Sequence, residues 1–174
     1  GLIVTMPDKT GILQYLDELS PAAELMGAVN TVVRDGDRLI GHNTDGAGFM
    51  RAVALAGVDV IGKKMTLIGA GGAGSAIYTQ AALDGVKEIA VFNIRDGFFD
   101  ATARRLAEVA DRTGMHLKLY DLADKTELAK QISDSALIAD ATKGGMPPLD
   151  NESNVAKQWL VAGQAVADTV YVPQ

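Results

Sequence analysis

A glycine-rich turn between an apolar strand and a helix places the strongest constraint on what this chain can fold into. Residues 65–68 form a short apolar run, and a helix-forming stretch begins at Gly72. Between them, Gly69, Gly71 and Gly74 have the spacing G-x-G-x-x-G. The first glycine permits a tight turn, the second lets the backbone approach a pyrophosphate, and the third lets helix pack on strand. Because N–H groups at a helix start attract phosphates, the motif predicts a dinucleotide-binding turn.

Strands and helices alternate along the chain from this turn onward. Such alternation predicts an α/β fold of the Rossmann type, in which a parallel sheet carries helices on both faces. This setting favours a dinucleotide site over the alternative, a tight turn without a ligand. We expect strands at 65–68, 88–92, 115–120, 136–140 and 165–170, and helices at 72–83, 99–112, 124–132 and 152–158.

The first part of the chain has a different pattern and must supply the substrate site, because a nucleotide fold alone specifies no reaction. A composition change near Gly62 predicts a domain boundary, with residues 1–62 as part of a smaller α/β substrate-binding domain and 63–174 as the dinucleotide-binding domain. Asp35 and Gly36 form a hairpin signal between two apolar runs. Within this part we expect a strand at 2–5 and helices at 11–19 and 46–56.

Composition excludes several classes of function. The net charge is −6 and basic residues form no cluster, which disfavours a nucleic-acid partner. The sequence contains no uninterrupted apolar run of about eighteen residues, so no membrane span is expected. Cysteine is absent and His42 and His116 have no metal-ligand spacing, so no metal site is expected. We expect no secretory signal and a cytoplasmic location.

A carboxylate follows the second strand of the predicted sheet. Asp96 lies where an acidic side chain accepts hydrogen bonds from both adenosine ribose hydroxyls and repels the 2′-phosphate of NADP. This position favours NAD. Arg95 keeps NADP possible, because its guanidinium could stack on adenine or pair with a phosphate. A structural alternative is that Asp96 or Asp100 caps the helix that follows.

Lys9 and Asp45 form the candidate catalytic pair. Pro7 restricts the backbone after the first strand and holds Lys9 near the carboxyl edge, where α/β proteins gather ligands. Oxidation of a secondary alcohol requires a positioned base for the hydroxyl proton, and a nearby aspartate would orient the lysine. Taken alone, Lys9 could be a solvated lysine, and residues 43–46 (Asn-Thr-Asp-Gly) could be a turn and helix cap.

Several motifs occur in one order along essentially the whole chain. They are 4–9 (Val-Thr-Met-Pro-Asp-Lys), 27–31 (Gly-Ala-Val-Asn-Thr), 41–46 (Gly-His-Asn-Thr-Asp-Gly), 69–73 (Gly-Ala-Gly-Gly-Ala), 141–146 (Ala-Thr-Lys-Gly-Gly-Met) and 168–173 (Asp-Thr-Val-Tyr-Val-Pro). Together they resemble the shikimate dehydrogenase family. Residues 93–99 and 148–153 are more similar to its quinate/shikimate dehydrogenase branch.

The resemblance implies roles for individual residues. Lys9 and Asp45 would be the catalytic pair, Thr5 and Asn30 would bind the hydroxyl or carboxylate groups of the substrate, and Tyr171 would border both ligands. On the cofactor side it implies Ala70, Gly71, Gly72 and Ala73 at the pyrophosphate, Asn93, Arg95 and Asp96 at the ribose, and Thr142, Lys143, Met146, Thr169 and Tyr171 near the nicotinamide.

The implied activity is the interconversion of shikimate or quinate with its 3-dehydro form in the shikimate pathway of aromatic amino acid biosynthesis. NAD is the expected cofactor, NADP is possible, the partner is a small hydroxy acid, and a homodimer is possible. One alternative is a dinucleotide-binding module whose catalytic half has decayed or been truncated. Another is a different Rossmann enzyme, such as a methylene-folate dehydrogenase, which residues 43–45 fit less well.

The two ends of the sequence suggest a fragment. An apolar run opens at residue 2, and an apolar strand near residue 166 is followed by no closing helix. We therefore expect the chain to be truncated at both ends and to have weak or no activity by itself.

Overall fold

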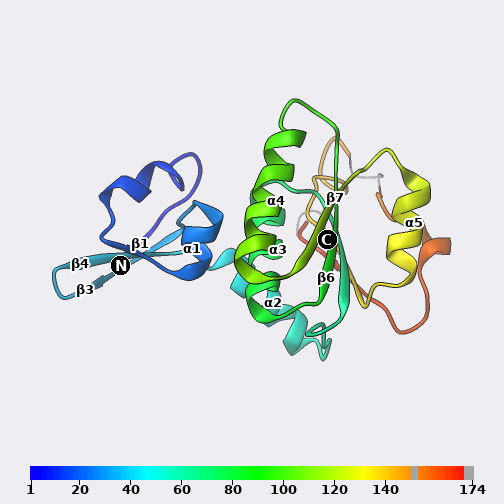
Figure 1. The fold of residues 1–174 in the computed structure, drawn as a ribbon, viewed down its shortest axis with the longest axis horizontal. Helices are drawn as coiled ribbons and strands as arrows, with labels where there is room; N and C mark the ends of the chain where they lie inside the picture. Colours follow the sequence, from blue (N-terminus) through cyan, green and yellow to red (C-terminus); the bar gives the residue numbers. More distant parts are fainter. Residues whose placement is uncertain (150–152, 171–174) are drawn as a thin grey trace.

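Two β-sheets lie side by side in the computed structural model, which describes residues 1–149 and 153–170. A four-stranded sheet is formed by residues near the N-terminus, and a five-stranded sheet by the later strands (Figure 1). Among the described residues, no helix is both long and apolar enough to cross a membrane.

The smaller sheet has the order β1-β3-β4-β2. Its centre is the predicted hairpin, but Asp35 pairs with Arg38, so the two-residue loop is Gly36 and Asp37, one residue later than expected. Gly36 has φ +60°, which suits glycine at the first loop position. The strands are β1 (Leu2–Ile3), β2 (Glu18–Leu19), β3 (Thr31–Asp35) and β4 (Arg38–His42).

The predicted helix at 11–19 is wrong. Only a 3-10 helix, η1 (Gly11–Tyr15), forms there, and Glu18–Leu19 is strand β2, parallel to β4. The backbone of Asp17 donates to Leu39 O over 2.9 Å, and its carboxylate accepts from Leu39 N over 2.7 Å. Pairing with β4 therefore overrides the local helical pattern.

One short helix was not predicted. Helix α1 (Pro21–Met26) begins after Ser20, whose hydroxyl accepts from Ala23 N. It ends at Gly27, which has φ +65°, a left-handed conformation that favours glycine.

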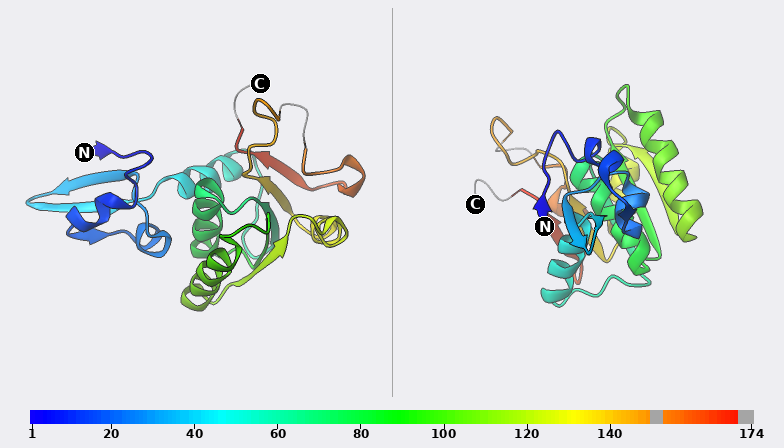
Figure 2. Two further views of the ribbon diagram at one scale, coloured as in Figure 1. Left: turned by 90° about the horizontal axis from the view of Figure 1, so that it is seen from above. Right: turned by 90° about the vertical axis from the view of Figure 1, so that its left-hand side faces the viewer.

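The larger sheet is a Rossmann-type parallel sheet, as predicted, with the order β7-β6-β5-β8-β9. Helices α2, α3 and α4 lie on one side of it and α5 on the other (Figures 1 and 2). The strands are β5 (Lys64–Ile68), β6 (Glu88–Asn93), β7 (His116–Asp121), β8 (Leu137–Asp140) and β9 (Ala165–Asp168), and the helices are α2 (Asp45–Leu55), α3 (Gly72–Asp84), α4 (Phe99–Thr113) and α5 (Lys125–Ser133).

Both faces of the larger sheet are buried. On one face Leu67 and Val91 pack in a core with side chains of α2, α3 and α4. On the other, Phe92 and Ile138 pack with Leu128 of α5. Burial on both faces explains why strands β5 and β6 are apolar runs instead of alternating patterns.

The predicted helix at 152–158 is also wrong in its described part. Residues 153–156 are not helical, and only a 3-10 helix, η2 (Lys157–Trp159), follows. Trp159 and Val155 pack against the core beneath α5, which draws this segment across the sheet face instead of into a helix. Residue 152 lies outside the described residues.

Helix α2 connects the two sheets and packs on the larger one. Met50 and Val53 belong to the same buried core as Leu67. Gly46 lies so close to α3 that a Cβ there would be 2.2 Å from the carbonyl oxygen of Ala76. The functional division into domains 1–62 and 63–174 stays a prediction.

Candidate active site and dinucleotide-binding edge

Three polar side chains from separate segments meet in one hydrogen-bonded group beside the smaller sheet. Lys9 Nζ donates to Asp45 Oδ2 over 2.7 Å, and Asn30 Nδ2 donates to Asp45 Oδ1 over 2.8 Å. Each carboxylate oxygen therefore receives a donor. The side chains of Lys9 and Asp45 are 26% and 41% exposed, so a small ligand can reach the pair. The structure brings the predicted pair together, and its catalytic role stays a prediction.

The orientation of Asn30 follows from the loop before α2. Asn30 is buried, and its Oδ1 accepts from Thr44 N over 3.0 Å and from Thr31 Oγ1 over 2.9 Å. These donors fix the amide so that its Nδ2 faces Asp45. Asp45 is the first residue of α2, where the helix N-terminus stabilises a carboxylate.

Hydrogen bonds to backbone carbonyl groups anchor the segments that carry this group. Val29 N donates to Lys9 O over 2.8 Å, which ties the turn before η1 to the sheet. Asn43 Nδ2 donates to Ala28 O over 3.2 Å. Ala28 in turn packs against Ala76 of α3, so the group lies beside the helix that begins at the glycine turn.

Two of the predicted substrate contacts are not part of this group. Thr5 is exposed, and its side chain makes no hydrogen bond with Lys9, Asn30 or Asp45. Tyr171 lies outside the described residues.

The glycine turn has the geometry that its motif predicts. Gly69 has φ +91°, and a Cβ at Gly74 would lie 2.0 Å from Gly69 O. A Cβ at Gly71 or Gly72 would meet nothing within 4 Å, so space remains above the helix start. No side chain caps α3 at Gly71, and no acidic residue lies in its first turn. The N–H groups at this helix end are therefore available to an anion.

The turn is tied to the neighbouring strand. Ala70 N donates to Asn93 Oδ1 over 3.1 Å, which joins the loops after β5 and β6. Ala73 lies exposed in the first turn of α3. The predicted pyrophosphate and ribose contacts are thus adjacent at the carboxyl edge of the sheet.

The predicted ribose loop carries two charged residues with different surroundings. Asp96 is exposed, and its Oδ1 accepts from Phe98 N over 2.9 Å. Phe98 occupies the N-cap position of α4 without a capping hydrogen bond, so Asp96 shapes the loop before the helix and does not cap it. Arg95 turns toward β7, where its Nε donates to Asp121 Oδ2 over 3.1 Å. Its guanidinium carbon lies 4.4 Å from the centre of the Phe99 ring.

A cavity of about 390 Å³ lies over the carboxyl ends of β5, β6 and β8. Its lining includes Gly69, Asn93, Thr142 and Lys143, four residues from three loops. Met146 is not among its lining residues. This cavity contains some of the predicted dinucleotide-binding residues, and its role stays a prediction.

Asp140 and Asn154 support one wall of this cavity, and neither was predicted as a site residue. Asp140 Oδ1 accepts from Thr142 N over 2.9 Å and from Thr142 Oγ1 over 2.7 Å. Asn154 Nδ2 donates to Asp140 Oδ2 over 3.0 Å. Thr169 N donates to Asp140 O over 3.0 Å, which places this predicted residue at the end of β9. The sequence indicated a role for Asp140 only in that an aspartate stands at the end of a predicted strand.

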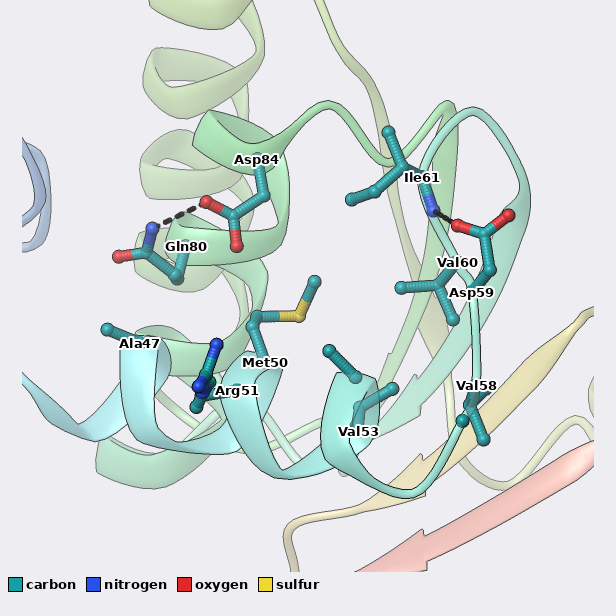
Figure 3. A pocket seen from close by; sticks show the side chains of 12 residues that line it. Ala47, Met50, Arg51, Val53, Val58, Asp59, Val60, Ile61, Gln80 and Asp84 are labelled. Carbon is teal, nitrogen blue, oxygen red and sulfur yellow. Dashed lines mark hydrogen bonds between the residues drawn. The ribbon is translucent and has the colours of Figure 1, made fainter.

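A larger cavity lies elsewhere, at the C-terminal ends of α2 and α3. Its volume is about 690 Å³, and Met50, Val53 and Val60 line its apolar part (Figure 3). Asp84 and Gln80 lie at its rim, joined by a hydrogen bond of 2.8 Å. None of the predicted site residues lines it, so its size does not mark the active site.

Comparison with known proteins gives matches over the whole chain. A family model for the shikimate dehydrogenase substrate binding domain matches residues 1–32. A shikimate dehydrogenase (NADP(+)) from Listeria monocytogenes is 48% identical over 99% of the chain, and a quinate/shikimate dehydrogenase from Escherichia coli is 44% identical over the same share. The chain spans 60% of the length of these curated relatives.

Solved structures match the fold as well. The crystal structure of shikimate 5-dehydrogenase from Listeria monocytogenes in complex with shikimate and NAD has a TM-score of 0.94 and 49% identity, covering 98% of this chain and 60% of that one. Quinate dehydrogenase from Corynebacterium glutamicum in complex with NAD has a TM-score of 0.82 and 29% identity, covering 99% of this chain and 59% of that one.

Proposed function

We propose that the chain belongs to the shikimate dehydrogenase family and carries the proton-transfer pair and the dinucleotide site of an NAD(P)-dependent dehydrogenase of shikimate or quinate. The observation that carries the proposal is the group Lys9–Asp45–Asn30, with hydrogen bonds of 2.7 and 2.8 Å. A module that only binds a dinucleotide has no need of an accessible ammonium held by a carboxylate.

The reaction requires a proton and a hydride to leave one carbinol group. When bound, NAD or NADP supplies the hydride acceptor. Once the Lys9 ammonium has released one proton to solvent, the lone pair on Nζ takes the hydroxyl proton, and in the reverse direction the ammonium gives its proton to the carbonyl oxygen. Asp45 holds Nζ in place, and Asn30 holds the carboxylate by its other oxygen. Because Lys9 and Asp45 are both partly exposed, the proton can pass on to solvent.

The glycine turn fits a pyrophosphate. The positions of Gly71 and Gly72 are open, and the start of α3 presents uncapped N–H groups. The exposed Asp96 supports a preference for NAD, since a carboxylate accepts from ribose hydroxyls and repels a 2′-phosphate. NADP remains part of the proposal, because the Listeria relative is named an NADP(+) enzyme, although the two solved structures described above hold NAD.

Other parts of the proposal rest on the resemblance. Thr5 and Asn30 are the proposed ligands of the substrate hydroxyl or carboxylate groups, and Tyr171 the residue that borders both ligands. Lys143, Met146 and Thr169 are the proposed nicotinamide-side contacts. A homodimer and a cytoplasmic location belong to the same proposal and are tested by sedimentation and by fractionation of the producing cells.

The test replaces Lys9 by methionine and separates chemistry from binding. Reduction of NAD and of NADP is followed with shikimate and with quinate, and the dissociation constant of NAD is measured by titration. We expect kcat to fall by about 10²- to 10⁴-fold, as for loss of a general base, with NAD affinity nearly unchanged. Lys87→Met, at an exposed lysine on the loop before β6, is the charge-matched control and should keep both values.

Equal losses of turnover and NAD affinity in Lys9→Met would contradict the proton-transfer role. If the unaltered chain binds NAD but turns over neither hydroxy acid, the alternative applies, namely a dinucleotide-binding module with a decayed or truncated catalytic half.

A further inference from the structure

The guanidinium of Arg95 already contacts two side chains of its own chain, those of Asp121 and Phe99. Its Nε donates to Asp121 Oδ2 over 3.1 Å, and its guanidinium carbon lies 4.4 Å from the centre of the Phe99 ring. An ion pair directs the guanidinium toward β7, and the aromatic face holds its plane. Arg95 is therefore bound on two sides by its own chain.

Asp121 is well placed to hold this arginine. It ends β7, and the register pairs it with Asn93 at the end of β6, so the carboxylate comes from the strand next to the ribose loop. Asp121 Oδ1 accepts from Ala123 N over 2.9 Å, which fixes the carboxylate and leaves Oδ2 for Arg95. This N–H group, followed by the Arg95 guanidinium, holds the pKa of Asp121 below its usual value of 3.8. The carboxylate is thus ionised at neutral pH.

The engagement of Arg95 affects which dinucleotide the loop accepts. A 2′-phosphate is bound best by a free guanidinium, which offers paired N–H donors. A 2′-phosphate that binds Arg95 competes with Asp121 for the Nε–H group and with the Phe99 ring for the position of the guanidinium. NAD has no 2′-phosphate and does not compete, so both contacts disfavour NADP relative to NAD.

We infer that Asp121 is a specificity-determining residue, which favours NAD over NADP by holding Arg95 in an ion pair away from the ribose 2′ position. The inference rests on the proposed dinucleotide site but not on turnover. It assigns the discrimination to two carboxylates with different actions: Asp96 meets the ribose directly, whereas Asp121 withholds the cation that a 2′-phosphate would need.

The test measures binding of NADH and NADPH to the chain by their own fluorescence. Asp121→Ala should raise NADPH affinity relative to NADH by about two- to fivefold, the range expected for one exposed ion pair. Asp121→Asn keeps an acceptor for Ala123 N and should give a smaller shift in the same direction, which guards against a folding defect in the alanine variant. Asp111→Ala, an exposed carboxylate of α4, is the control for net charge.

The double variant Arg95→Ala/Asp121→Ala identifies the cause. If Asp121 acts through Arg95, the gain in NADPH affinity disappears in the double variant, and 0.5 M salt removes most of the gain in the single variant. A gain that persists without Arg95, or that Asp111→Ala reproduces, would overturn the inference and indicate general charge repulsion. An unchanged affinity ratio in both Asp121 variants would overturn it as well, while leaving the proposed function intact. Failure of the unaltered chain to bind either dinucleotide would refute both.

Discussion

Replacing Gly46 by alanine tests whether the close contact between α2 and α3 holds Asp45 in place. A Cβ at Gly46 would lie 2.2 Å from Ala76 O and 2.7 Å from the Cβ of Gln80. Ordinary van der Waals contact begins at 3.4 Å, so the helices would have to separate by roughly 1 Å. The obstacles are a backbone oxygen and a Cβ, and no rotamer change can move either of them.

The magnitude follows from two opposing terms. Overpacking costs about 1–3 kcal/mol, and a backbone obstacle places Gly46→Ala near the upper end. Alanine recovers at most about 1 kcal/mol over glycine through helix propensity. We expect a net loss of about 2 kcal/mol in the free energy of unfolding, or about 4–8 °C in Tm for a chain of this size.

Thermal unfolding followed by circular dichroism measures the loss, and Gly48→Ala is the matched control. Gly48 lies in the same helix, is exposed, and a Cβ there would meet nothing within 4 Å. This variant should gain up to about 1 kcal/mol of stability. Because separation of the helices moves Asp45, any turnover should also fall in Gly46→Ala and persist in Gly48→Ala. A Gly46→Ala protein that melts at or above the parent Tm would refute the argument.

Further predictions concern the dinucleotide edge and the response to acid. Alanine at Gly74 would place a Cβ 2.0 Å from Gly69 O, so we expect a loss of about 1–3 kcal/mol in urea unfolding and weaker NADH binding; an unchanged NADH affinity would count against the packing role. Asp140→Ala removes the acceptor that holds one cavity wall, and the KM for the dinucleotide should rise more than the KM for the hydroxy acid; equal rises would argue for a purely structural role. The Gln131 amide lowers the pKa of Glu127 below 4.5, so the stability it contributes is complete above that pH and is lost as the pH falls through the lower folded-state value. Gln131→Met should therefore flatten the decline of the urea midpoint as the pH falls below 4.5, and a parallel decline in both proteins would exclude this linkage.

The larger sheet could be predicted because its signals are local. Gly69 is favoured by its φ of +91° and Gly74 by its contact with Gly69 O in the same turn, and strands buried on both faces are apolar runs. Helix α1 also had a local signal, since Ser20 followed by Pro21 is a typical cap and first helical residue, and it was overlooked.

Other features depend on contacts between distant segments, and the sequence carries no local trace of them. The stretch 11–19 has a helical spacing of apolar residues, but its second half pairs with β4 instead. The network of Asp140 with Asn154 and the ion pair of Arg95 with Asp121 each join segments that meet only in the folded sheet. The proximity of Lys9 and Asp45 could be anticipated, because both follow strands whose ends gather ligands. The role of the buried Asn30, which binds the other oxygen of Asp45, came from the family resemblance.

The packing of α2 determines how this chain can be divided. A fragment that begins near residue 63 would lose Met50 and Val53 and expose the core that they share with Leu67. A cut in the short segment between β4 and α2 would keep Met50 and Val53 with that core and separate from it only Leu25 of α1 among its buried residues. Asp45 would then stay with the larger piece and Lys9 with the smaller, so the ion pair would become an intermolecular contact. Mixing the two pieces would rebuild the ion pair between Lys9 and Asp45 by complementation. Formation of this pair would then indicate that the pieces have reassembled.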